Sequence, residues 1–158
     1  MSHREFPATA TRATICAYFW AGIAVGVFQF QGSKDWAFSV IEALSEPPIE
    51  IIEIATANDR NNAMDALESA VQGADQRLAG RWLLADILDQ LNAGYISASE
   101  AIRLAMRVVQ TTGLPDEVYY DLDALDDELQ LAANGVYSTP AGVSLDVARS
   151  LGEHSGAT

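Results

Sequence analysis

The sequence contains few of the residues that enzymes most often use for chemistry. It has one cysteine and two histidines, and the histidines lie near the two ends, at His3 and His154. We expect mobile tails there, over residues 1–12 and 153–158, so a Ser-His-Asp or Cys-His site would have to recruit a tail residue. No CxxC, HExxH or ExxH pattern indicates a metal, and no GxxxxGK[ST] or strand-borne GxGxxG indicates a nucleotide. We therefore expect no catalytic residue, no metal and no cofactor, and a protein that is not an enzyme.

Basic residues are also scarce. Nine Lys and Arg stand against 22 Asp and Glu, which gives a formal net charge of −13. Nucleic acid and anionic membrane surfaces would be repelled by such a chain, because it has no basic stripe to displace counterions from phosphates. A basic protein would be attracted, and its association accelerated. The composition therefore favours a basic protein partner and argues against nucleic acid and membrane partners.

The single cysteine, Cys16, lies in an apolar run. One cysteine cannot form an internal disulfide, so nothing indicates an oxidising compartment, and we expect the protein in the cytoplasm. We interpret Cys16 as a small buried hydrophobic residue, because we identify no neighbouring cation that would lower the pKa of its thiol.

The longest uncharged run has 21 residues, between Arg12 and Lys34. Its length is close to that of a membrane span, and the arginines before it resemble the start of a signal peptide. Gly22 and Gly26 interrupt the run, glutamines follow Phe28, and no small-x-small cleavage site follows. We favour a buried core helix, or two short helices with a break near the glycines. A membrane anchor over residues 13–31 and a cleaved signal are the alternatives.

The rest of the chain is predicted to form helices separated by short turns. Glycines that are expected to stop helices occur at positions 73, 94, 113, 135 and 152, so each interval holds one helix and one loop. Half of the residues are apolar (49%), as in globular proteins. We predict an all-α fold, either an antiparallel multi-helix bundle or a short helical superhelix of about seven to eight helices, in one domain over residues 13–152.

Local signals place several helix ends. Ser33 is a plausible N-cap for a helix over residues 34–44, and Ser97 begins an S-x-x-E capping box. Thr139 and Pro140 predict the start of a final helix that Gly152 ends. Residues 49–57, IEIIEIATA, could form a strand, but Ile49, Ile52 and Thr56 follow helical spacing and no other segment offers a strand partner, so we favour a helix.

The segment from Pro115 to Gly135 stands out by its charge. It carries a helical apolar stripe, made of Val118, Leu122, Leu125, Leu129 and Ala132. On its other faces lie seven carboxylates and no Lys or Arg, at Asp116, Glu117, Asp121, Asp123, Asp126, Asp127 and Glu128. Tyrosines flank these acids at positions 119, 120 and 137, and such amphipathic aromatics occur in interfaces and at the rim of a core.

Four interpretations of this acidic segment are open. A cation site is disfavoured because consecutive helical carboxylates diverge, and no pair is marked out as a glycosidase pair. A solvated helix face is the ordinary explanation of a charge run. The fourth is a docking surface for a basic partner, with candidate partner-binding residues Asp116, Glu117, Tyr120, Asp123, Asp126, Asp127 and Glu128.

The helix punctuation also supports a resemblance. The segments that carry it are Trp36-Ala37, Pro47-Pro48 before Ile51-Ile52-Glu53-Ile54-Ala55, and Asp126-Asp127-Glu128 with Leu131-Ala132 and Gly135-Val136-Tyr137. As a helix pattern over residues 15–152, the chain resembles small, acidic, all-helical bacterial immunity proteins, which are encoded beside secreted or contact-delivered toxins. The resemblance implies a cytosolic inhibitor that covers a toxin, often a basic nuclease, and it assigns no functional residue because such proteins differ in binding mode.

The leading hypothesis is therefore an immunity protein or antitoxin that neutralises a basic toxin domain by occlusion through its acidic helix. The alternatives are a helical adaptor or scaffold that binds a peptide or helix, and a membrane-associated protein anchored by residues 13–31. The sequence does not predict an oligomeric state.

Overall fold

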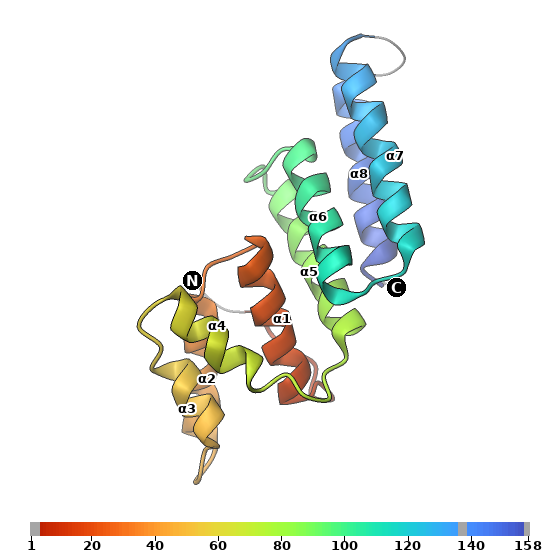
Figure 1. Ribbon diagram of the computed structural model, residues 1–158. Coiled ribbons are helices and arrows are strands. Elements are labelled where there is room, and N and C mark those ends of the chain that lie inside the picture. The colour runs from red at the N-terminus through yellow and green to blue at the C-terminus, as the bar shows by residue number, and fades with distance from the viewer. Residues whose placement is uncertain (1–3, 136–138, 157–158) are drawn as a thin grey trace. The chain divides into compact units, whose positions relative to one another are not determined.

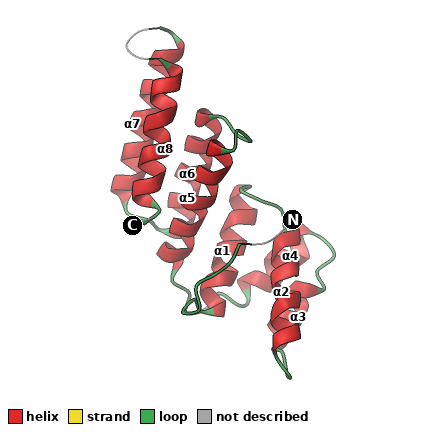
Figure 2. Cartoon of the chain, turned by 180° about the vertical axis from the view of Figure 1, so that it is seen from behind, coloured by secondary structure: helices red, strands yellow, loops and turns green. Residues whose placement is uncertain are grey.

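The fold is entirely helical over the part of the chain that the structure describes, residues 4–135 and 139–156 (Figures 1 and 2). A computed structural model shows eight helices there, packed antiparallel, and no strand. They are α1 (Arg12–Val25), α2 (Gln31–Ala43), α3 (Ile49–Ala55), α4 (Arg60–Glu68), α5 (Gln76–Asn92), α6 (Ala98–Thr112), α7 (Asp116–Ala133) and α8 (Pro140–His154). The prediction of an all-α fold of seven to eight antiparallel helices is confirmed, including the helix rather than the strand at α3.

The chain divides into two compact units, residues 1–79 and 80–158. Unit 1 contains α1 to α4 and the first residues of α5, and unit 2 contains the rest of α5 with α6 to α8. The prediction of a single domain over residues 13–152 stays a prediction.

Helix α1 occupies the first part of the uncharged run. Thr11 caps it by accepting a hydrogen bond from the Thr14 amide, and Gly26 ends it in the left-handed conformation. Ten of its fourteen residues are buried, including Cys16 and Phe19, so this helix is apolar because it is the core of unit 1. None of the described helices is long and apolar enough to span a bilayer.

The segment before α1 is attached to it by aromatic contacts. The Phe6 ring meets the rings of Tyr18 and Phe19 edge-on, with centroids 5.4 and 5.9 Å apart. The Arg4 guanidinium lies 5.8 Å from the centroid of the Tyr18 ring, within the range of a cation–π interaction. Part of the expected N-terminal tail therefore packs on α1, a contact that the polar composition of residues 1–12 does not indicate.

Helices α2 and α3 pack against each other, and one detail of the prediction for α2 is wrong. Ser33 is not a cap but lies fully buried inside α2, where its hydroxyl donates to the Phe30 carbonyl. In α3, Ile49 and Ile52, whose spacing favoured a helix, are exposed, and Ile51 and Ile54 are buried. Both isoleucine sets fit helical spacing, and only the position of the neighbouring helices decides which set faces them.

In unit 2 the predicted caps form. The Ser97 hydroxyl accepts from the Glu100 amide and approaches the Glu100 carboxylate, and Thr139 caps α8 with Pro140 in its first turn. Gly80 of α5 lies so close to the Thr112 side chain that a Cβ would stand 2.3 Å from its Oγ1 atom, so this glycine permits α5 to approach the end of α6.

The end of α8 differs from the prediction. Gly152 does not stop the helix; it lies inside α8, 3.7 Å from Leu88 at the position of its missing Cβ. The helix continues to His154, and Gly156 has a positive φ of 70°. His154 is therefore the last residue of a packed helix and not part of a tail.

Candidate functional site

The turn between α6 and α7 sets the position of the acidic helix. Gly113 adopts the left-handed conformation, and the amides of Gly113 and Leu114 both donate to the Val109 carbonyl. Pro115 follows in an extended conformation at the N-cap of α7, where its missing N–H has no consequence. The chain therefore reverses within three residues and lays the start of α7 along the end of α6.

The apolar stripe of α7 fixes how the helix is rotated. Val118, Leu122 and Ala132 are buried, and Leu125 and Leu129 are half-buried. Neighbouring helices α6 and α8 both pack on α7. The predicted stripe is confirmed, and with 3.6 residues per turn it determines where each acidic residue points.

The seven carboxylates lie on three sides of α7 and not on one face. Opposite the buried stripe runs a line spaced by four, three and four residues, made of Asp116, Tyr120, Asp123 and Asp127. All four side chains are exposed, and Tyr120 is 66% exposed. We call these four residues the acidic ridge.

One flank of the ridge faces α8. Asp121 lies there, and its Oδ2 atom is 2.8 Å from Nε2 of His154. Glu117 lies one turn before Asp121, and Glu128 lies on the same side further along the helix. The other flank faces α6 and carries Tyr119 and Asp126.

Of the candidate residues, Asp126 alone is partly covered and has a described side-chain partner. It is half-buried and accepts a 3.2 Å hydrogen bond from the Gln130 amide. Among residues 4–135 and 139–156, no Lys or Arg forms an ion pair with a carboxylate of α7. The ridge carboxylates are therefore exposed to solvent without a described Lys or Arg partner, and the positive end of the helix lies near Asp116 only.

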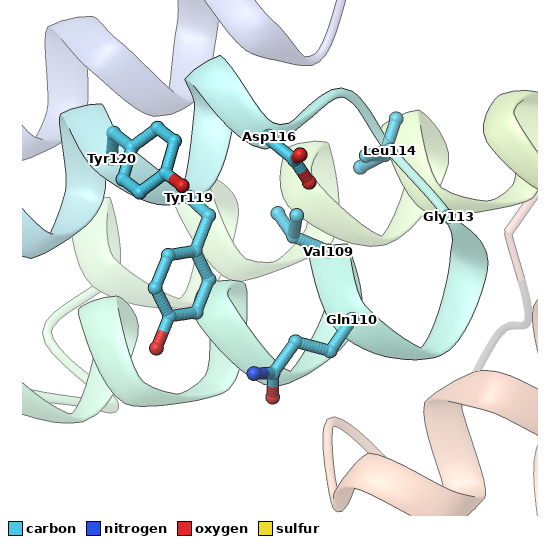
Figure 3. A pocket seen from close by; sticks show the side chains of 7 residues that line it. All are labelled: Val109, Gln110, Gly113, Leu114, Asp116, Tyr119 and Tyr120. Atoms are coloured by element: carbon cyan, nitrogen blue, oxygen red, sulfur yellow. The ribbon is translucent and has the colours of Figure 1, made fainter.

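A hollow of about 300 Å³ opens beside the start of the ridge (Figure 3). Its lining residues are Val109, Gln110, Gly113, Leu114, Asp116, Tyr119 and Tyr120. The two tyrosine rings stand nearly perpendicular, at 87°, with centroids 6.2 Å apart. In Figure 3 the Tyr119 ring extends from α7 toward α6. The hollow is at the small end of ligand sites and suits one side chain of a partner, with apolar contacts and a carboxylate together.

The structure thus separates the candidate residues that the sequence grouped. Asp116 and Tyr120 line the hollow, Asp123 and Asp127 continue the ridge, and Glu117, Asp126 and Glu128 lie on the flanks. The four lining residues from α6 and the turn were not predicted, because only the reversal at Gly113–Pro115 brings them next to α7. Tyr137, the third tyrosine noted in the sequence, lies outside the described residues, as does His3.

No group of three His, Cys, Asp or Glu side chains in the described ranges is close enough together to hold a metal ion. His154 and Asp121 form the one described histidine–carboxylate pair, and it joins the end of α8 to α7. The hydroxyl next to that pair, on Ser155, donates to the Gly152 carbonyl instead.

Comparisons with protein-family models, with curated proteins and with solved structures find no match to this chain.

Proposed function

We propose that this chain is a non-enzymatic binding protein that docks a basic protein on the acidic ridge of α7. The observation that carries the proposal is the ridge itself: three carboxylates and Tyr120 stand exposed in one line, directly opposite a buried stripe. A helix held in this way presents its charges in a fixed orientation, so a partner meets them without an ordering cost.

The charges of the ridge are suited to binding a partner, whereas they do not stabilise the folded helix. Asp123 and Asp127 are four residues apart, and such a like-charge pair destabilises a helix by a few tenths of a kcal/mol. Lys or Arg side chains of a partner would relieve this repulsion in the complex, and the charge would accelerate encounter. The hollow beside Asp116 and Tyr119 offers an anchor point for one such side chain.

The finer proposal is that the partner is a toxin domain and that binding neutralises it. A row of carboxylates can occupy a surface that a basic nuclease uses for phosphates, and thereby exclude the nucleic acid. The resemblance to immunity proteins and the net charge of −13 support this reading.

The test begins with the gene directly upstream. If it encodes a toxin domain, cells that express it should survive when this chain is co-expressed. The ridge variant D123N/D127N should lose protection and weaken binding to the purified toxin domain by about tenfold or more, with a flatter salt dependence.

Two matched double variants serve as controls. D65N/E68Q removes the same charge from exposed positions of α4, and E117Q/E128Q removes it from the α8-facing flank of α7. Both should protect as well as the wild type. Full protection by D123N/D127N would move the interface away from the ridge, and an upstream metabolic enzyme would contradict the toxin proposal.

A further inference from the structure

The C-terminal end of α7 carries the one Asn-Gly dipeptide of the sequence, Asn134-Gly135. Of the five asparagines, at positions 58, 61, 62, 92 and 134, only Asn134 precedes a glycine. The following residue matters because its backbone nitrogen can attack the side-chain amide of the asparagine, and a Cβ on that residue hinders the approach. Glycine has no Cβ, so Asn134 is open to an intramolecular reaction that the residues after the other four asparagines disfavour.

The fold leaves this dipeptide accessible. Asn134 is the C-cap of α7, and both Asn134 and Gly135 are exposed. Among the described residues, none holds the Asn134 side chain by a hydrogen bond. Gly135 has a positive φ of 74°, which ends the helix. The side-chain amide of Asn134 can therefore rotate toward the peptide bond that follows it.

A single hydrogen bond restrains the attacking atom. In the closed turn, the Gly135 amide donates a 3.0 Å hydrogen bond to the Ala132 carbonyl. The Gly135 nitrogen does not attack while this bond holds its N–H. Helix ends fray, and their hydrogen bonds open with free energies close to zero, unlike those of a buried core. Opening of the last turn therefore exposes the nitrogen without unfolding the rest of α7.

We propose that Asn134 is a site of spontaneous deamidation. Once the turn opens, hydroxide removes the proton of the Gly135 amide, and the nitrogen attacks the Cγ atom of Asn134. A bond forms between these two atoms, the bond from Cγ to Nδ2 breaks, and Nδ2 takes up a proton and leaves as ammonia. Water then opens the resulting succinimide at either carbonyl, which gives aspartate or isoaspartate at position 134. The reaction consumes water and needs no oxidant, reductant or cofactor.

Both products change the end of α7. Each places a new carboxylate at the negative end of a helix that already carries seven carboxylates and no Lys or Arg. Isoaspartate also adds one methylene to the backbone before Gly135, so the Gly135 amide loses its position beside the Ala132 carbonyl. The modified chain should therefore melt at a lower temperature. The inference does not depend on the role of the acidic ridge.

The test is incubation of the purified full chain at physiological temperature, at neutral and at mildly alkaline pH. Peptide mapping by mass spectrometry follows each asparagine, and chromatography separates aspartate from isoaspartate peptides. We expect Asn134 to convert, and to convert faster at the higher pH because the attacking nitrogen must lose its proton. A parallel incubation in urea gives the rate with the turn open, and the native rate should lie within about tenfold of it.

Asn92 is the matched internal control. It is the last residue of α5 and is exposed like Asn134, but Ala93 follows it. In the same samples Asn92 should convert at least tenfold more slowly than Asn134. The variant A93G places a glycine after Asn92 and should raise its rate in urea to that of Asn134. The variant N134Q should keep its melting temperature during incubation, whereas that of the wild type should fall.

Two results would overturn the proposal. One is an intact Asn134 in the native chain after a time that converts it fully in urea, since the last turn of α7 would then stay closed. The other is conversion of Asn92 as fast as that of Asn134 in the native wild type, since the following glycine would then not determine the site.

Discussion

Cys16 shows how the interior of unit 1 acts on a single ionisable group. Its side chain is fully buried in α1, and burial raises the pKa of the thiol to about 12, although Arg12 one turn earlier lowers it somewhat. The sequence-based interpretation of a buried, unreactive thiol agrees with this direction, but it overlooked Arg12. Desolvation outweighs the cation because the thiolate would have no water around it.

The raised pKa predicts how stability depends on pH. An unfolded thiol ionises near its ordinary value of 9.0, so from there to about pH 12 the unfolded chain binds fewer protons than the folded chain. The stabilising contribution is complete below pH 9 and is lost as the pH rises. Between pH 8 and pH 10 we expect the wild type to lose roughly 1 kcal/mol more of its free energy of unfolding than the Cys16→Ala variant does. Urea denaturation of both proteins at the two pH values measures the difference, and parallel pH profiles would contradict it.

Helix α7 combines a packed apolar side with an exposed row of like charges. Its stripe faces α6 and α8, and the acidic ridge lies directly opposite. Asp116 and Glu117 are stabilised at the positive N-terminus of the helix, whereas Asp123 and Asp127 are too far along it for that. Packing of the stripe therefore stabilises a helix that the repulsion between its own carboxylates destabilises.

Because the ridge carboxylates repel one another, we predict a stabilising substitution. D123N/D127N removes a like-charge pair at i, i+4, so the free energy of unfolding should rise by roughly 0.2–0.5 kcal/mol at low salt, and the gain should shrink at high salt. Thermal unfolding followed by circular dichroism measures it, with D65N/E68Q as the charge-matched control. A lower melting temperature for the ridge variant would show that its carboxylates stabilise the free helix, and would remove one support of the proposed binding role.

On the scale of the whole molecule, each of the two units has its own buried core. In unit 2 the fully buried side chains come from all four helices, at Leu83, Leu84, Ile87, Ile102, Val108, Leu122, Val143, Val147 and Leu151. Gly80 approaches Thr112, and Gly152 approaches Leu88, so α5 contacts both α6 and α8 within this unit. Helix α5 is therefore an essential part of the core of unit 2.

A fragment experiment follows from this arrangement. Residues 76–158, which keep α5 whole, should fold to a helical protein that unfolds cooperatively in urea. Residues 98–158 lack α5 and its three fully buried large side chains, Leu83, Leu84 and Ile87. Each of these contributes about 2 kcal/mol on burial, so this shorter fragment should not unfold cooperatively. Circular dichroism during urea titration distinguishes the two, and a non-cooperative longer fragment would show that unit 2 needs the rest of the chain.

The sequence by itself determined the helices and most of their ends. The signals that set these ends are caps, left-handed glycines and helical spacing, as at Thr139, Ser97, Gly113 and the stripe of α7. They act within a few residues, so no distant contact is needed to predict them. The exposure of Asp116, Asp123 and Asp127 also followed from the stripe, since the buried side of a helix fixes the opposite side.

Only the tertiary structure decided the features that depend on how two or more helices pack together. It selected Ile51 and Ile54 over Ile49 and Ile52 for burial, buried Ser33, and joined His154 to Asp121. The hollow beside the ridge depends likewise on which helices become neighbours. Burial is a property of the space between elements, and a local pattern compatible with two faces carries no information about which one will be covered.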